Sequence, residues 1–293
     1  MNATPVTASP IALHKDMGIL QAHAAVMAEC LRHIEANAPG VVAGTDAEFL
    51  HQMRVGLRRL NAALRLFGNV RSLPQPLRLE VKWLDAALGP ARDWEVLANS
   101  TLPRITASAP AHLGLAALLQ LAQEAAQRHN ASAAQAVASP RCRALLDALH
   151  AWAAQTPQDM PQPNARLKRF AKALLDSASK RLRRRAQHLP QAGQRRLHRS
   201  RIAAKRLRYA LEFFTSQYPS GPARRRIDTL GVFQDALGAI NDAAVAHALL
   251  EHEAASHPAL HTAIAYVRGY LQADSRHQTK ALAGLWKRLR RAL

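Results

Sequence analysis

The sequence predicts an all-α protein made of two related helical halves. Alanine and leucine are abundant, aromatic residues make up only 5% of the chain and β-branched runs are short, which favours helices over strands. The stretch from His51 to Leu64 returns as His198 to Leu211, and Leu88-Gly89 to Asp93 returns as Leu237-Gly238 to Asp242. The two motif pairs keep their order at offsets of 147 and 149 residues. Each half is therefore expected to be one helical bundle, with approximate symmetry between the two.

Proline, glycine and capping signals divide the first half into helices. Residues 1–10 are expected to be a flexible N-terminus, and residues 11–155 the first bundle. A capping box at Thr45-Asp-Ala-Glu48 begins the first basic helix, which runs to about Gly68. The other predicted helices span 11–37 (ending near Pro39-Gly40), about 76 to Leu88-Gly89-Pro90, from Arg92 onward, 112–137, and a helix opened by Ser139-Pro140.

A proline-rich segment separates the halves. Residues 156–164 contain three prolines, which remove backbone donors and favour extended conformations, so a linker is expected there. Residues 165–293 form the second bundle, with predicted helices at about 165–188, 194–217, 222–237, 240–256 and 258–291.

The charge of the chain is strongly positive and unevenly distributed. Its 40 Lys and Arg residues against 20 Asp and Glu give a net charge of +20, and 32 of the 40 are arginine. Residues 1–155 carry 14 basic against 11 acidic residues, a net +3, while residues 156–293 carry 26 against 9, a net +17. Between Arg166 and Arg208 there are 16 basic residues and one acid, Asp176. Arginine pairs two donors with two phosphate oxygens. We therefore expect the positive charge to bind a phosphate polyanion rather than to form a solvated surface without a ligand.

The repeated helix has two neighbouring faces of different chemistry. At 3.6 residues per turn, His51, Arg54, Arg58 and Arg65 form one stripe in the first copy. In the second copy the stripe is formed by His198, Arg201, Lys205 and Arg208. The adjacent stripe is apolar in both copies and is expected to face a core. Cations held this close repel one another, so the basic stripes are destabilising unless solvent or an anion neutralises them.

Several other classes of protein and site are not indicated. Two cysteines, Cys30 and Cys142, are too few for a disulfide framework, and with no secretory signal or long apolar run a cytoplasmic location is expected. His252-Glu253 to His257 has the wrong spacing for a zinc helix, so no metal is expected. The chain has no phosphate-cradling glycine loop, serine elbow or paired catalytic carboxylates, so neither an enzyme nor a cofactor is predicted.

These motifs resemble the CHAD family of histidine-containing helical domains. The first half carries His51-x-x-Arg54-Val-x-x-Arg58-Arg59-Leu60 and Leu84 to Asp93. The second carries His198-x-x-Arg201-Ile-x-x-Lys205-Arg206-Leu207-Arg208-Tyr209 and Gln234 to Asp242. The pattern covers most of the chain, from about residue 11 to residue 290.

The resemblance implies both a fold and a function. It implies two four-helix bundles about a pseudo-twofold axis, with the histidine helices facing a shared basic channel across which His51 and His198 meet. It also implies non-enzymatic binding of inorganic polyphosphate and docking on polyphosphate granules. The residues that it assigns to this binding are His51, Arg54, Arg58, Arg59 and Lys82 from the first half and His198, Arg201, Lys205, Arg206 and Arg208 from the second.

One position departs from the family pattern. Asn61, the counterpart of Arg208, stands where the family usually has a basic residue. This predicts that the first half binds the anion less tightly at this position. Arg65 lies one turn further along the same stripe and is expected to compensate.

Other interpretations of the same residues remain open. The two histidines are either ligand donors or helix-packing groups that cap a carbonyl. Arg92-Asp93 and Asn241-Asp242 are better explained as salt bridges or helix caps than as ligand contacts. The same arginines suit nucleic acid, although few aromatics are present to stack bases. His51-Gln-Met-Arg54-Val-Gly56 is also similar to a histidine phosphotransfer site, but the second copy has Ala203 in place of the glycine.

Overall fold

The all-α class is confirmed by the computed structural model of the chain. The structure describes every residue except 1–3, 15, 156–166, 188, 190–191 and 219, and the described residues contain no strand. The predicted linker, 156–164, lies outside the described residues. No described helix is both long enough and apolar enough to cross a membrane.

The first half contains six α-helices, some close to their predicted bounds. They are α1 (Ile19–Ala43), α2 (Ala47–Leu66), α3 (Gln75–Val96), α4 (Leu102–Thr106), α5 (Leu115–Ala138) and α6 (Pro140–Ala154). The side chain of Asp46, not Thr45, caps α2 by accepting from the Glu48 amide. Ser139 caps α6 as predicted, by accepting from the Cys142 amide.

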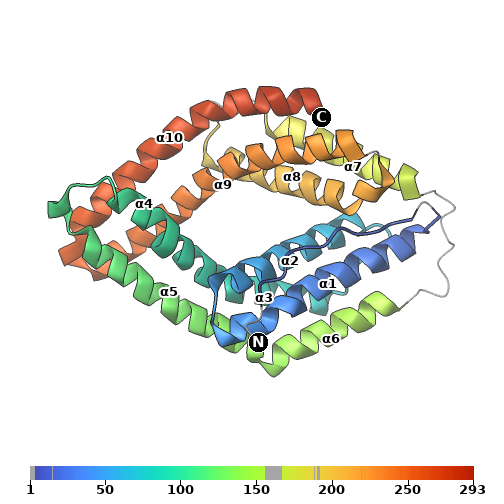
Figure 1. The fold of residues 1–293 in the computed structure, drawn as a ribbon, viewed down its shortest axis with the longest axis horizontal. Helices are drawn as coiled ribbons and strands as arrows, with labels where there is room; N and C mark the ends of the chain where they lie inside the picture. Colours follow the sequence, from blue (N-terminus) through green and yellow to red (C-terminus); the bar gives the residue numbers. More distant parts are fainter. Residues whose placement is uncertain (1–3, 15, 156–166, 188, 190–191, 219) are drawn as a thin grey trace.

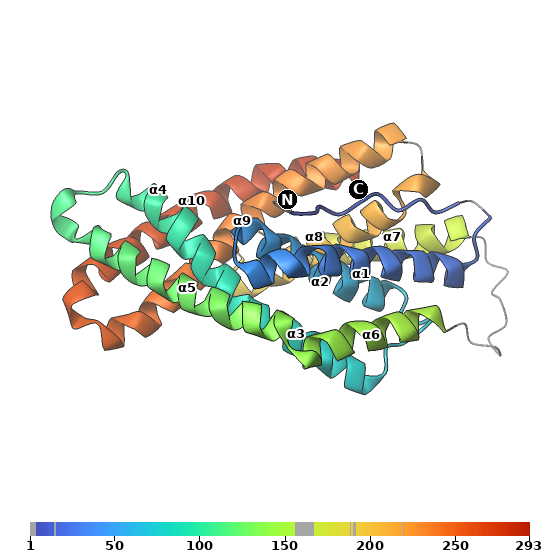
Figure 2. The same cartoon turned by 60° about the horizontal axis from the view of Figure 1, so that its bottom comes forward.

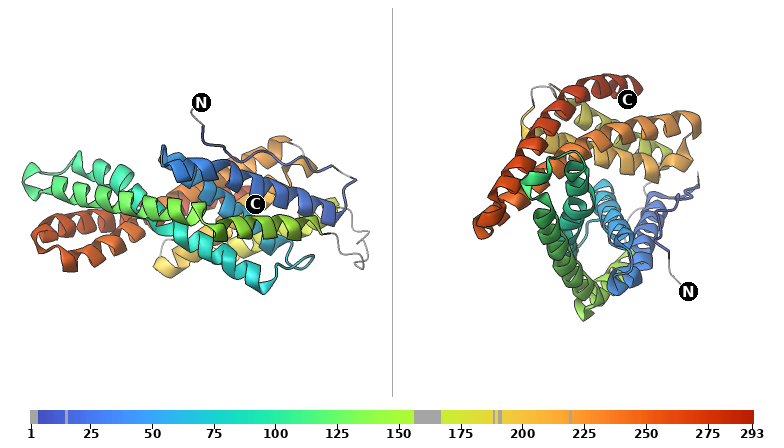
Figure 3. Two further views of the ribbon diagram at one scale, coloured as in Figure 1. Left: turned by 90° about the horizontal axis from the view of Figure 1, so that it is seen from below. Right: turned by 60° about the vertical axis from the view of Figure 1, so that its left-hand side comes forward.

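The described part of the second half contains four α-helices. They are α7 (Leu167–Arg185), α8 (Gln194–Phe213), α9 (Ser220–Ser256) and α10 (His261–Ala292). In Figure 1 these helices occupy the upper side of the molecule, while α1, α2, α3, α5 and α6 occupy the lower side. The two hairpins α4–α5 and α9–α10 project towards the same end (Figure 3, left).

The predicted breaks at the Leu-Gly motifs are wrong. Helix α3 continues through Pro90 to Val96, and α9 runs without interruption through Gly238. Leu88, Ala91 and Trp94 are buried on one side of α3, so tertiary packing outweighs the backbone hydrogen bond that Pro90 cannot donate. The first helix likewise passes Pro39-Gly40 and ends only at Ala43, where the left-handed backbone of the capping residue Gly44 (φ 64°) terminates it.

Residues before Ile19 do not form the predicted start of a helix at residue 11. Residues 4–14 run as an extended segment alongside α1 (Figure 2), where the Val6 amide donates to Asn37 Oδ1 at 3.0 Å. The segment also reaches the second half, because the Leu13 amide donates to Ser216 Oγ at 3.1 Å. With Ile11 and Leu13 buried, this segment contributes to the core.

Packing crosses the boundary between the sequence halves. One core contains first-half residues together with Leu167, Ala171, Phe213 and Phe214. A second core joins α3, α4 and α5 to α9 and α10 at the far end of the molecule, and only the third belongs to the second half alone. The two repeats therefore occupy separate stretches of the chain, but two of the three hydrophobic cores contain residues from both.

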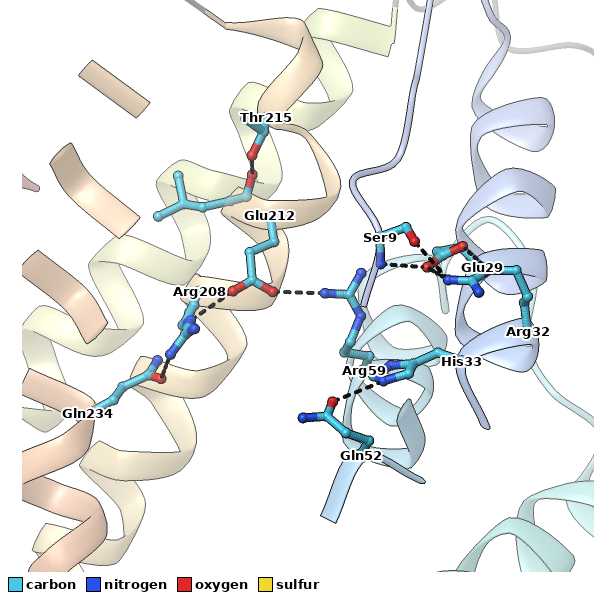
Figure 4. Close-up of polar contacts among 11 residues, drawn as sticks. Ser9, Glu29, Arg32, His33, Gln52, Arg59, Arg208, Glu212, Thr215 and Gln234 are labelled. Atoms are coloured by element: carbon cyan, nitrogen blue, oxygen red, sulfur yellow. Dashed lines mark hydrogen bonds and ion pairs between the residues drawn. The ribbon is translucent and has the colours of Figure 1, made fainter. Parts of the chain in front are cut away.

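A buried ion pair also joins the halves. Arg59 on α2 donates from Nη1 to Glu212 Oε2 on α8 at 2.9 Å (Figure 4). Its guanidinium also lies over the ring of Phe213. Arg208 donates from Nε to the other oxygen of Glu212 at 2.7 Å. The Arg59 side chain is only 5% exposed, so its charge depends on this carboxylate for compensation.

We predict that Glu212→Ala lowers the free energy of unfolding by about 3 kcal/mol, because Arg59 then stays buried without a counter-charge. Urea denaturation measures this loss. The control is Glu124→Ala on the exposed surface of α5, which is expected to change stability by less than about 0.5 kcal/mol. Equal stability of the two variants would contradict this role of Glu212.

Candidate functional site

A cationic cavity lies where α2 and α8, the two copies of the repeated helix, run beside each other. Its volume is about 800 Å³. Helix α3 and the segment before it close the first-half side. The basic residues that line it are Arg58, Arg65, Arg78, Lys82, Arg201, Lys205 and Arg206, and Asp85 is the only acidic residue among the lining residues.

A smaller hollow of about 350 Å³ continues the cavity along α8. Arg201 lines both. The smaller hollow has an apolar floor of Leu197, Leu237 and Ile240, and His198 stands in its wall. The Nδ1 atom of His198 lies 3.4 Å from Asn241 Oδ1 on α9. The two hollows therefore form one path lined by cations, with Arg201 at the junction.

The environment of Lys205 disfavours the protonated, charged form of its side chain. Burial, and after it the nearby positive charges of Arg58 and Arg201, lower its pKa from 10.5 to about 7. The carboxylate of Asp242 opposes this shift but does not cancel it. Without an anion, Lys205 is therefore close to half-protonated at neutral pH.

Two aspartates lie behind the cavity, one from each repeat. Burial raises the pKa of Asp93, and the negative charge of Asp242 nearby raises it too. The positive charges of Arg54 and Arg201 oppose this rise in the pKa of Asp93. Burial lowers the pKa of Arg201, and the negative charge of Asp242 in turn opposes that shift. One arginine and one aspartate of each copy thus meet here, where the acids partly balance the cations.

Several guanidinium groups have incomplete hydrogen bonding. The Nε atoms of Arg54, Arg58 and Arg201 are buried and have no hydrogen-bond partner among the described residues. A buried donor without an acceptor costs on the order of 1–3 kcal/mol. Arg58 and Arg201 line the cavity, so an anion that supplies oxygen atoms there would satisfy donors that the protein does not.

Comparison with known proteins gives the family. The model of the CHAD domain family matches residues 25–251. The chain belongs to the CHAD domain family. It is similar to the crystal structure of the CHAD domain from the plant Ricinus communis, with 38% identity, a TM-score of 0.90 and coverage of 98% of this chain and 97% of that one.

A second solved structure shares the fold. PptA from Streptomyces chartreusis is 22% identical, with a TM-score of 0.67, and the match covers 93% of this chain and 99% of that chain. No curated protein matches the sequence.

The cavity brings together most, but not all, of the candidate binding residues named from the sequence. Those that line one of the two hollows are Arg58, Arg65, Lys82, His198, Arg201, Lys205 and Arg206. Arg59 and Arg208 are not among the lining residues, because both are engaged by Glu212. Arg54 lies behind the cavity, where its Nη1 donates to the Asp85 carbonyl oxygen at 3.3 Å.

His51 is also set apart from the lining residues. Burial and the positive charge of Arg92 lower its pKa to about 4, so it is neutral at neutral pH. Its position beside Arg92 corresponds to that of His198 beside Asn241, since Arg92 and Asn241 are equivalent residues of the second motif. Each histidine therefore lies next to the same motif of its own half, and the predicted meeting of His51 with His198 stays a prediction.

The departure at Asn61 has a simple structural outcome. Asn61 lines the cavity, but its Nδ2 donates to the Leu57 carbonyl oxygen of its own helix at 3.1 Å. Its counterpart Arg208 serves the ion pair with Glu212. This position therefore adds no cation to the cavity in either copy, whereas Arg65 does line the cavity.

The salt-bridge explanation of the second motif is right for Arg92, which pairs with Glu95. The helix-cap explanation is wrong, because both motifs lie inside continuous helices.

Sequence reasoning missed two residues of the wall. Tyr209 lies four residues after Lys205, so the helical spacing that identified the stripe could have included it. Burial raises the pKa of the Tyr209 phenol, which remains a hydroxyl donor. Arg78 lies outside both repeated motifs, and no local pattern points to it.

Among the described residues, no group of three or more His, Cys, Asp or Glu side chains is placed to hold a metal ion.

We predict that Lys205→Met stabilises the protein most at pH 7 and below, and progressively less towards pH 10. The pKa of Lys205 is about 7 in the fold and 10.5 in the unfolded chain. Unfolding therefore takes up a proton between these values, so the wild type gains stability as pH rises while the variant lacks this gain. Chemical denaturation of both proteins across this range measures it. With Lys280→Met on exposed α10 as the control, a pH-independent difference for Lys205→Met would contradict the prediction.

Proposed function

We propose that this CHAD protein binds inorganic polyphosphate in the cavity between α2 and α8, without chemically altering it. The observation that carries the proposal is the set of buried, unpartnered guanidinium donors beside Lys205, which lies among like charges. A linear chain of phosphates offers about one negative charge and several oxygen acceptors per unit, which matches a row of cations. Granule docking belongs to the same proposal, since a protein that holds polyphosphate collects where polyphosphate accumulates.

Each wall of the cavity has a distinct part in the proposed binding. Arg58 and Arg201 donate charge-assisted hydrogen bonds from opposite helices, which fixes the chain between the two repeats. Lys205 takes up a proton as the anion arrives, because the negative charge restores its ordinary pKa. His198 and Tyr209 add further hydrogen-bond donors along the path. Arg59 and Arg208 are left out of the contact set, because their charges are used by Glu212.

A nucleic acid is the main alternative ligand. Its phosphates would suit the same arginines, but a cavity of about 800 Å³ between two helices offers no aromatic platform for bases beyond Tyr209. Competition separates the two ligands. Displacement of polyphosphate by RNA or duplex DNA at equal phosphate concentration would favour the nucleic acid.

Histidine phosphotransfer is the less favoured alternative. The glycine that suggests it, Gly56, has a packing role: a Cβ atom there would lie 2.8 Å from Ile34 Cγ1, so only glycine allows α1 and α2 to approach this closely. Acid-labile phosphate on His51 after incubation with a phosphodonor would revive this function.

We predict that a variant with Arg58→Gln, Arg201→Gln and Lys205→Gln loses about a hundredfold in affinity for polyphosphate, since three charge-assisted contacts are removed. Isothermal titration calorimetry measures the affinity. Repeating it over a range of salt concentrations is expected to give a less steep salt dependence for the variant than for the wild type, because fewer counterions are released.

The matched control removes three positive charges from exposed positions of α10, as Arg276→Gln, Lys280→Gln and Lys287→Gln. It is expected to keep most of the affinity, which excludes net charge alone as the cause. Equal losses in the two variants would overturn the proposed site, and a wild type that does not bind polyphosphate would overturn the function.

A further inference from the structure

Helix α7 carries cations that the cavity does not use. Lys180, Arg181 and Arg184 lie on one face of this helix at helical spacing, and all three are exposed. Together with Ser177 and Ala173 they line a shallow hollow of about 560 Å³. Like charges on neighbouring turns destabilise a helix unless something outside the protein balances them.

The acid on this helix balances these cations only in part, since Lys180 contributes to lowering the pKa of Asp176 after the main effect of Lys172. Asp176 also lines the hollow, but its carboxylate accepts from Lys172 Nζ at 2.7 Å. Asp176 is the single acidic residue between Arg166 and Arg208. The charges of Lys180, Arg181 and Arg184 therefore remain available to a ligand.

The α7 cations continue the cationic path out of the cavity. Helix α7 packs along α8, and Arg206 on α8 lines the cavity. Burial lowers the pKa of Arg206, and the positive charges of Arg65 and Arg181 lower it in turn. Arg206 therefore lies near both a cavity residue, Arg65, and an α7 residue, Arg181, so cations continue from the cavity through Arg206 to α7.

We propose that the surface formed by Lys180, Arg181 and Arg184 on α7 is an exit site that binds the part of a polyphosphate chain extending beyond the cavity. This inference rests on the proposed function and adds to it a preference for long chains. A short oligophosphate fills the cavity and stops at Arg206, whereas a long chain continues onto α7 and gains further contacts. The exit site is open and carries no aromatic side chain among its lining residues, which suits a flexible phosphate chain better than stacked bases.

The test compares α7 variants with a matched α10 control, on a short phosphate chain, a long one and RNA. One variant has Lys180→Ala, Arg181→Ala and Arg184→Ala; the control has Arg276→Ala, Lys280→Ala and Lys287→Ala on α10, which removes the same charge. Affinities for tripolyphosphate and for long-chain polyphosphate are measured by calorimetry at several salt concentrations. The α7 variant is expected to lose roughly tenfold in affinity for the long chain, as three exposed ion pairs would supply, and to bind tripolyphosphate as the wild type does.

The outcomes separate the exit site from the cavity. In the α7 variant the salt dependence of long-chain binding is expected to become less steep, by about one for each lost contact, and the charge-conserving variant Lys180→Arg, Arg181→Lys, Arg184→Lys is expected to keep the wild-type affinity. Equal effects of the α7 and α10 variants would overturn the exit site while leaving polyphosphate binding intact. Unchanged long-chain affinity, together with lost RNA binding, would assign α7 to nucleic acid and also overturn it. Failure of the wild type to bind either phosphate would instead overturn the proposed function.

Discussion

Repulsion among cations held between α2 and α8 is the constraint on which the rest of the structure depends. Burial, together with the positive charges of Arg58 on α2 and Arg201 on α8, lowers the pKa of Lys205 to about 7. Such a cluster persists only if the helices that carry it are held by other forces. The buried apolar faces of both helices, which include Met53, Leu57, Ala204 and Leu207, provide this support.

The acidic residues reduce the same repulsion at two places. Asp93 and Asp242 lie behind the cavity, where they partly compensate Arg54 and Arg201. Glu212 holds Arg59 and Arg208 outside the set of lining residues. The ion pairs of Glu212 therefore use Arg59 and Arg208 to connect the two halves. The arginines that line the cavity remain available to an anion. A protein with uniformly distributed acids would have a more stable empty cavity and a weaker attraction for polyanions.

The sequence predicts the fold class and the identity of the cationic helices well, because both depend on local periodicity. His51 to Leu64 and His198 to Leu211 carry a basic stripe beside an apolar one, and this spacing alone identifies Arg58, Arg201 and Lys205. What could not be predicted depends on tertiary contacts. Arg59 and Arg58 are neighbours in sequence, yet only the position of Glu212 on the other half decides that Arg59 serves the interface. Packing around Trp94 likewise carries α3 through Pro90, where local rules predict an end.

In the proposed function, the fold keeps the cations of the cavity in an unfavourable charge state, and a bound polyanion relieves it. Proton uptake on binding tests this claim most directly. Calorimetric titration of long-chain polyphosphate at pH 8, in buffers of different ionisation enthalpy, measures the number of protons taken up. The expected result is uptake approaching about one proton per protein molecule in the wild type, because Lys205 is mostly neutral before binding and charged after it, and markedly less in Lys205→Met. Binding without proton uptake, or equal uptake in both proteins, would contradict the claim.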